Sequence, residues 1–232
     1  MPILNLKAAS ESALALLFPM PPNFLNLKLS EKNMDVKDFL KAVSARRSNY
    51  KLGGSSPIPG GEITEIVREI VRNSPSAFNS QSSRVAILFS ESAKKFWEIV
   101  FETLSPKTPP ENAAVFRDKI DSFAAAYGTI LFFDDEKVTN ATAEKFPEFA
   151  KNFPLWAQQS NAMIQFAVWC ALTAAGLGAN LQHYNPAIDE AVREEYGFPV
   201  RWKLIAQMPF GSPAEPPAQK PDTPIGSRVI VI

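Results

Sequence analysis

Hydrophobic and polar positions alternate with helical spacing in several parts of the chain. In residues 34–47 apolar side chains recur every three or four positions after Asp35, which predicts a helix that begins with an N-cap and ends close to Arg46 and Arg47. A very apolar stretch at about 158–176 predicts a long buried helix rather than a membrane span. Similar periodicity predicts helices over residues 62–74, 92–104, 111–126 and 186–197, and one or two short helices over 144–156.

Short runs of β-branched and aliphatic residues predict strands between the helices. These runs cover residues 84–89, 128–135 and 202–211, and the chain ends on another, RVIVI, at 228–232. A Pro-rich passage over residues 212–224 precedes this last run, and its stiff, extended backbone would carry the final strand far enough to reach a second subunit. Helices interspersed with a few short strands indicate an α+β or mixed α/β domain.

The composition is that of an ordinary globular domain with no overall charge. The 232 residues are 46% hydrophobic, and 24 Lys and Arg balance 24 Asp and Glu, so neither nucleic acid nor a membrane is expected as a partner. Cys170 is the only cysteine, which excludes an intramolecular disulfide and favours a reducing compartment, the cytoplasm. Residues 1–33 are expected to form an N-terminal extension that is flexible or serves targeting. An organelle presequence is the weaker interpretation, because this segment contains no arginine.

Side-chain chemistry alone offers few routes to catalysis. His183 is the only histidine and is distant from Cys170 in the sequence, so neither a catalytic triad nor a multi-histidine metal site is indicated. The Gly-rich motifs of the common nucleotide-binding folds are also missing. The acidic cluster FDDE, residues 133–136, is interpreted as a solvated turn or a helix cap rather than as ligands of a hard metal ion. No metal is therefore predicted.

Four stretches carry a resemblance to a known family: RRSNY (46–50), NSPSAFNSQSSR (73–84), GLGANLQHYNP (176–186) and the terminal SRVIVI. Over nearly the whole of residues 34–232 the chain resembles the nitroreductase family of flavoproteins. The runs QQSNAMIQFAVWCAL and WKLIAQMPFG are most similar to its short subgroup related to the fatty acid repression mutant protein. The resemblance implies an α+β sandwich with a central, mostly antiparallel sheet flanked by helices. It also implies an intertwined homodimer that binds FMN at two sites formed by both subunits.

The resemblance assigns the FMN phosphate to residues far apart in the sequence. Arg46 and Ser48 would hold the phosphate, Arg47 would contribute backbone or flanking charge, and Arg228 would add a second guanidinium. Paired, charge-assisted hydrogen bonds from arginine suit a phosphate dianion. Tyr50 stands where larger relatives often carry Lys or Arg beside the flavin, so less positive charge and a lower reduction potential are expected.

The isoalloxazine ring would be bound by two further segments. Ala77 departs from relatives that often carry serine, and the pair Gln182 and His183 replaces a frequent Glu-Gly pair whose backbone donates to flavin N5. The implied contacts are Ser76, Ala77 and Asn79 from the neighbouring subunit, and Leu181, Gln182 and His183 beside the ring.

Each of these residues also has an ordinary interpretation when it is taken singly. Arg46 and Arg47 could complement a helix C-terminus, Arg228 could protect an edge strand, Asn79 could belong to a turn, and His183 could be a loop residue. Only their joint pattern favours a flavin site.

The function implied by the resemblance is that of an FMN-dependent oxidoreductase. It would take a hydride from NADH or NADPH at flavin N5 and pass it to nitroaromatics, quinones or similar electrophiles by a ping-pong mechanism, so no side chain need act as acid or base. The alternative is a flavin-binding, redox-responsive regulatory protein linked to lipid or stress signalling, with little turnover.

Overall fold

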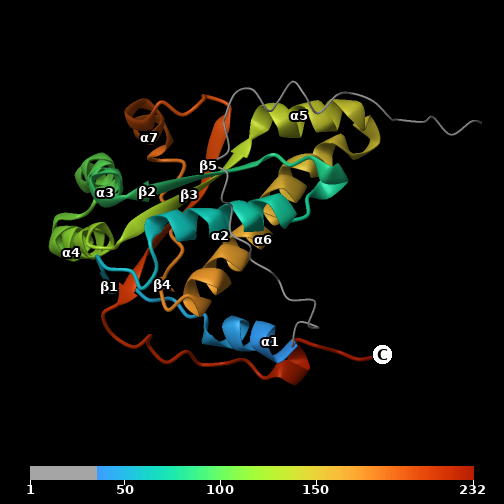
Figure 1. Ribbon diagram of the computed structural model, residues 1–232. Helices are drawn as coiled ribbons and strands as arrows, with labels where there is room; N and C mark the ends of the chain where they lie inside the picture. Colours follow the sequence, from blue (N-terminus) through green and yellow to red (C-terminus); the bar gives the residue numbers. More distant parts are fainter. Residues whose placement is uncertain (1–35) are drawn as a thin grey trace, which may run out of the picture. The chain divides into compact units, whose positions relative to one another are not determined.

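A computed structural model describes residues 36–232, which form one compact unit (Figure 1). The predicted N-terminal extension, residues 1–33, lies outside the described residues. The helices are α1 (Val36–Ala45), α2 (Gly60–Asn73), α3 (Ser90–Leu104), α4 (Ala113–Ala124), α5 (Glu136–Lys145), α6 (Phe153–Ala174) and α7 (Asp189–Tyr196). The strands are β1 (Leu52–Gly53), β2 (Ser83–Phe89), β3 (Gly128–Asp135), β4 (Gly178–Ala179) and β5 (Trp202–Pro213).

The strands form an antiparallel sheet in the order β1-β5-β3-β2, and β4 also pairs with β5. The three longest strands confirm the predicted runs at 84–89, 128–135 and 202–211. Strands β1 and β4 were not predicted, because two residues are too few to carry a periodic pattern. The predicted α+β sandwich with a mostly antiparallel sheet is confirmed.

The prediction of a strand at residues 228–232 is wrong for the single chain. A 3-10 helix, Ile225–Ser227, precedes these residues, and their backbone pairs with no strand of the described chain. Val231 is 94% exposed, so the run keeps its β-branched character but has no sheet edge beside it. Pairing with a second subunit stays a prediction.

A β-bulge in β5 places Leu204 and Ala206 on different faces of the sheet. Phe132 lies opposite Ala206, whereas Phe133 lies opposite Leu204, which leaves Ile205 as the extra residue. Leu204 therefore joins one hydrophobic core and Ala206 the other, although their spacing alone would place them on one face. Beside the bulge, the Asn161 side-chain amide donates to the Phe133 carbonyl at 3.0 Å.

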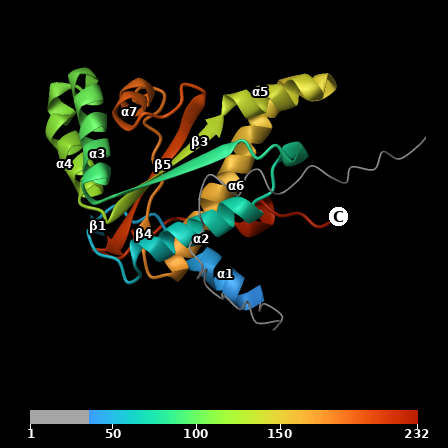
Figure 2. The same ribbon diagram turned by 45° about the horizontal axis from the view of Figure 1, so that its top comes forward.

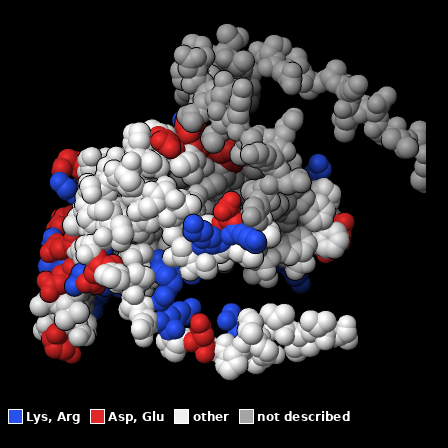
Figure 3. Space-filling view, turned by 60° about the horizontal axis from the view of Figure 1, so that its bottom comes forward, with Lys and Arg blue, Asp and Glu red and all other residues white. Residues whose placement is uncertain are grey.

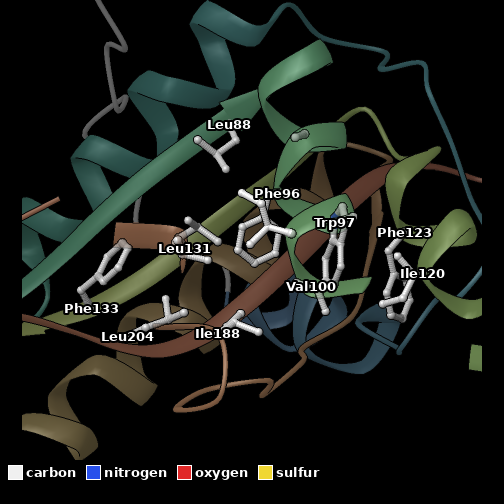
Figure 4. Close-up of a cluster of buried hydrophobic side chains, with 13 residues drawn as sticks. Leu88, Phe96, Trp97, Val100, Ile120, Phe123, Leu131, Phe133, Ile188 and Leu204 are labelled. Carbon is white, nitrogen blue, oxygen red and sulfur yellow. The ribbon is translucent and has the colours of Figure 1, made fainter. Parts of the chain in front are cut away.

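Helices cover both faces of the sheet, so the domain has two hydrophobic cores (Figure 2). Helices α3, α4 and α7 cover the first core, where Phe96, Trp97 and Phe123 are fully or almost fully buried (Figure 4). The Trp97 indole donates to the Thr129 hydroxyl at 2.8 Å, which satisfies its polar atom. Helices α2 and α6 cover the second core. All eight residues of β3 are buried as a result.

The long apolar helix is confirmed as α6, which begins five residues before its predicted start. Gln165, the polar residue that interrupts the apolar run after Ala162, is buried and donates to the Asn161 side-chain oxygen at 2.7 Å. None of the helices in residues 36–232 combines the length and apolar character needed to cross a membrane.

Asp134 and Asp135 of the acidic cluster are buried at the end of β3, which corrects the expectation of a solvated turn, whereas Glu136 is exposed at the start of α5. Asp134 accepts a hydrogen bond from the Thr139 hydroxyl at 2.9 Å, and Asp135 forms ion pairs with Arg84 and Arg201 at 3.2 Å. Asp135 precedes α5, but its side chain makes no capping hydrogen bond. Within the described part of the chain, no group of His, Cys, Asp or Glu is arranged to hold a metal ion.

Replacing Gly211 by alanine is expected to destabilise the domain by at least about 2 kcal/mol, because β5 approaches other backbone closely there. A Cβ at Gly211 would collide with the Gly53 carbonyl oxygen and lie 2.9 Å from the Tyr127 nitrogen. Backbone atoms cannot move aside as a side chain can. Urea unfolding measures the effect. Gly61→Ala is the control, because a Cβ there meets nothing within 4 Å. Equal stability of the two variants would contradict the prediction.

Candidate functional site

The segment that follows α1 is held by β4. Ser48 forms a parallel bridge with Ala179, and the Asn49 amide donates to the Ala179 carbonyl at 2.9 Å. Gly178 permits this approach, because a Cβ there would lie 3.0 Å from the Asn49 Cβ. Tyr50 is 55% exposed, and its carbonyl accepts a hydrogen bond from the Ser122 hydroxyl at 2.8 Å.

Arg46 lies against the C-terminal part of α6. Its guanidinium carbon is 4.6 Å from the centroid of the Trp169 ring, within the range of a cation–π contact. The neighbouring Cys170 is buried. Burial raises the pKa of the Cys170 thiol, and the positive charge of Arg46 partly offsets this effect.

Arg47 contacts the Pro-rich passage, residues 212–224, and not the Trp169 ring that Arg46 contacts. Its guanidinium donates to the Ala218 carbonyl, while the Ala214 amide donates to the Lys51 carbonyl at 3.0 Å. The Pro-rich passage therefore runs back along residues 47–51, and Arg47 helps to anchor it. Arg228 lies beyond this passage and is exposed. No described contact joins it to Arg46.

A cavity of about 520 Å³ opens beside this segment, between the end of α1, the end of α6 and the Pro-rich passage. Its walls include Ala45, Asn49, Thr173, Gly178 and Pro213. On the face in Figure 3, Lys and Arg lie beside Asp and Glu, and the described residues there form no continuous basic area. An anion would therefore have to be bound by local donors.

The segment that follows β4 is fixed by buried polar side chains. The backbones of Gln182 and Gln207 pair in both directions, at 2.7 and 2.9 Å. Asn180 is fully buried. Its side-chain amide donates to the Asn49 backbone carbonyl at 2.7 Å, and its side-chain oxygen accepts from the Gln182 side-chain amide at 2.8 Å. Leu181 packs on the second core, whereas His183 is exposed. Asn180 thus joins the segment after α1 to the segment after β4.

The Gln207 side chain extends the same network. Its side-chain oxygen accepts a hydrogen bond from the Tyr184 backbone amide at 2.9 Å, and its side-chain amide donates to the Asn185 side-chain oxygen at 3.0 Å. Burial raises the pKa of Tyr184 to about 12, so its hydroxyl stays protonated at neutral pH.

The turn with Ser76, Ala77 and Asn79 forms the 3-10 helix η1 (Ala77–Asn79). The Gln81 amide donates to the Ser76 hydroxyl at 2.9 Å, and the Gln81 side chain donates to the Asn79 oxygen at 3.1 Å. Phe78, Asn79 and Gln81 all have φ between 51° and 53°, a left-handed conformation that costs about 1–3 kcal/mol per non-glycine residue. The surrounding structure must therefore hold this turn in place.

Aromatic rings provide that support. The Phe78 ring lies 4.4 Å from that of Phe146, 5.4 Å from that of Phe153 and 6.0 Å from that of Trp156. Phe153 and Trp156 belong to the first turn of α6, so η1 is anchored at the N-terminal end of this helix.

The two groups of predicted flavin contacts lie at opposite ends of α6 (Figures 1 and 2). Arg46 stacks on Trp169, whereas Phe78 packs beside Trp156. Thirteen helical residues separate these tryptophans, a distance of about 20 Å along the axis. One chain therefore joins the segments around Arg46 and Gln182, but does not bring Ser76, Ala77 or Asn79 to them.

Three residues that organise these segments were not predicted to do so: Asn180, Gln207 and Trp169. A polar residue inside an otherwise apolar strand is a signal that could have identified Gln207, because such a residue must find buried partners. Asn180 lies within GLGANLQHYNP and was given no role. Trp169 was given no role in the flavin site.

The layered fold and the segments gathered at β4 define the class of protein. Residues 43–212 match the model of the Nitroreductase family, and the chain belongs to this family. The family is one of oxidoreductases.

Individual relatives make the similarity specific. Nitroreductase CinD from Lactococcus lactis, solved in complex with chloramphenicol, is 44% identical, with a TM-score of 0.76; the match covers 84% of this chain and 99% of CinD. The Saccharomyces cerevisiae protein HBN1 is 37% identical over 187 residues, which are 80% of this chain and 93% of HBN1. Nitroreductase FRM2 of the same yeast is 35% identical over 188 residues, covering 79% of this chain and 92% of FRM2. FRM2 is the fatty acid repression mutant protein, so the predicted subgroup resemblance is confirmed.

Replacing Asn180 by alanine is expected to lower the free energy of unfolding by about 2–4 kcal/mol. The substitution leaves the Asn49 carbonyl and the Gln182 amide without their partner. Urea unfolding followed by circular dichroism measures the loss. The control is Asn140→Ala, because Asn140 is exposed on α5 and should be almost neutral. A neutral Asn180 variant would refute the bridging role.

Proposed function

We propose that the protein is an FMN-dependent oxidoreductase that takes electrons from NADH or NADPH and reduces nitroaromatics, quinones or similar electrophiles. One observation carries the cofactor assignment. Among the described arginines, Arg46 and Arg228 are the two whose guanidinium groups have neither a carboxylate nor a carbonyl partner. The others pair with acidic side chains or, in the case of Arg47, with a carbonyl.

The donor set fits a phosphate. Arg46 and Ser48 lie two residues apart in a segment held by β4, and the Arg46 donors are not neutralised by a carboxylate within residues 36–232. A guanidinium and a hydroxyl together offer charge-assisted and neutral donors to phosphate oxygens. Arg228 would add a second positive charge once the C-terminal residues take their place in the assembled protein. Arg47 would keep its anchoring role.

The backbone after β4 supplies donors for the ring. The amides of Gln182 and Tyr184 point toward Gln207, and successive groups of an extended backbone alternate in direction. The amides of Leu181 and His183 therefore point the other way and have no acceptor among the described residues. Either amide is suited to donate to flavin N5, and no basic or acidic side chain is needed there.

When bound, FMN supplies reversible two-electron chemistry at N5, which lets donor and acceptor react in turn. The protein would bind the phosphate through Arg46 and Ser48 and orient the ring through the backbone after β4. This division of roles is consistent with a chain whose single histidine is exposed and whose single cysteine is buried.

Relatives support the proposed acceptors and donor. CinD, at 42–44% identity, was solved in complex with chloramphenicol, 4-nitrophenol and nicotinic acid. The first two carry a nitroaromatic ring, and nicotinic acid resembles the nicotinamide of NADH and NADPH. A nitroreductase from Desulfitobacterium hafniense with bound FMN has a TM-score of 0.61 over 83% of this chain and 97% of its own. At 15% identity it supports the fold alone.

The proposed active form is a homodimer. A second copy would bring the turn with Ser76, Ala77 and Asn79 to the segments around Arg46 and Gln182, which one chain holds apart. Strand β2 is an open edge of the sheet, and the exposed run 228–232 is apolar and suited to pair with such an edge. Exposed apolar side chains also lie unpartnered on two helices: Val36, Phe39 and Leu40 on α1, and Leu155, Met163 and Phe166 on α6.

A flavin-binding regulatory protein is the second candidate, and the similarity to FRM2 is the observation that favours it. In that case redox state rather than turnover would be the output. A reducing compartment such as the cytoplasm is proposed for either function.

We expect the purified protein to be yellow, to be bleached by NADH or NADPH without oxygen, and to regain its colour when 4-nitrophenol or a quinone is added. Anaerobic absorbance at the flavin band measures both half-reactions. Flavin binding and reduction without reoxidation by any acceptor would favour the regulatory candidate. A colourless protein that cannot be reconstituted with FMN would refute both.

Arg46→Ala and Arg228→Ala are each expected to weaken FMN binding by about 10- to 100-fold, the value of a hydrogen bond to a charged group. Fluorescence titration of apoprotein with FMN measures the affinity. Arg193→Ala is the matched control, because Arg193 pairs only with Glu190 on the same helix and lies outside the proposed site. Full FMN affinity in both site variants would overturn the phosphate assignment.

A further inference from the structure

The Arg46 guanidinium lies over the face of the Trp169 indole ring. The guanidinium carbon lies 4.6 Å from the Trp169 ring centroid. A planar guanidinium stacked on an indole keeps all its N–H donors at its edge, where they are free for another partner. The ring therefore restrains the side chain without using the donors that a phosphate requires.

Trp169 is itself well fixed. It lies near the end of α6 between the buried residues Val168 and Cys170, and it packs against the second core. The Trp169 carbonyl also accepts a hydrogen bond from the Thr173 hydroxyl at 2.9 Å. Helix α1 packs against the same helix (Figures 1 and 2). Arg46 directly follows α1, and its guanidinium reaches the indole. The ring is therefore partly buried against the second core rather than a fully exposed surface group.

A second stacked arginine in the chain illustrates a different use of the same contact. The Arg117 guanidinium carbon lies 4.4 Å from the Phe101 ring centroid, but its donors are occupied by Glu98 and Asp121. Arg46 has the ring and no carboxylate within the part of the chain that the structure describes. Of these two stacked arginines, only Arg46 combines a fixed orientation with an uncompensated charge.

We propose that Trp169 is a positioning residue for the cofactor phosphate: it holds the Arg46 guanidinium with its N–H edge presented to the phosphate of FMN, and makes no flavin contact of its own. The inference rests on the proposed function, because it requires Arg46 to bind that phosphate. It predicts that the effect of Trp169 on FMN affinity depends on Arg46.

A double-mutant cycle on the full-length protein tests the proposal. FMN affinity is measured for the original protein, Trp169→Leu, Arg46→Ala and the combined variant. We expect Trp169→Leu to weaken FMN binding by about 3- to 30-fold when Arg46 is present and to have little effect in the Arg46→Ala background. Trp169→Phe should give a smaller loss, because phenylalanine keeps an aromatic face. This variant also serves if the leucine substitution prevents folding.

Riboflavin lacks the phosphate, so its affinity distinguishes a role of Trp169 in positioning Arg46 from a general role of Trp169 in the structure. The affinity for riboflavin should be the same in the original protein and in the Trp169→Phe variant, while the affinity for FMN falls in the variant. Phe101→Leu is the matched control, since it removes the ring under Arg117 and should leave FMN affinity unchanged. Equal weakening of FMN binding by Trp169→Leu in both Arg46 backgrounds would refute positioning.

The two proposals fail in different ways. If Arg46→Ala leaves FMN affinity unchanged, the assignment of Arg46 to the phosphate is wrong. If Arg46→Ala weakens binding but neither Trp169 variant does, the phosphate assignment stands and the positioning role is refuted.

Discussion

The backbone of β5 between Ala206 and Pro213 is the constraint on which both the sheet and the candidate site depend. This half of the strand pairs with β3, with β1 and with β4, and its Gln207 pairs with Gln182. Apart from β3, the segments that it holds are two-residue strands and loops without a hydrophobic run of their own. Their positions therefore come from backbone hydrogen bonds to a strand that is buried between two helical layers. The loops gain the rigidity of the sheet, which is how a site built on loops can be preorganised.

The elements that the sequence predicted well are those whose pattern is local. Strand β3 agrees with the predicted residues 128–135, and α2 and α3 begin within two residues of their apolar periodicity. Strands β1 and β4 could not be predicted, because they exist only as partners of β5. Residues 228–232 show the opposite error: they have strong strand propensity, but propensity does not supply an edge to pair with. The early start of α6 had a signal in Pro154, which lies in its first turn.

The candidate site was harder to predict from the residues alone than the helices and strands were. Arg46 and Ser48 were identified through the resemblance to a family, and each has an ordinary interpretation when taken singly. The left-handed turn at Phe78 contains no glycine that would have announced it, and it depends on aromatic rings from the end of α5, from η4 (Pro147–Asn152) and from α6. The role of Asn180 arises from contacts between segments 131 residues apart. Such contacts leave no periodic trace in a sequence, whereas the family motif does include the residues that make them.

The charge balance of the chain explains why an aromatic support suits Arg46 better than a carboxylate would. With equal numbers of acidic and basic residues, the summed field gives a phosphate no general attraction, so the local site must supply it. An arginine already paired with a carboxylate would have to break that pair before binding a phosphate, and the carboxylate would then repel the ligand. An indole face attracts the guanidinium by about 0.5–2 kcal/mol and leaves its charge intact. A weak, neutral support thus fixes the orientation of Arg46 at little cost in affinity, which a stronger acidic partner could not do.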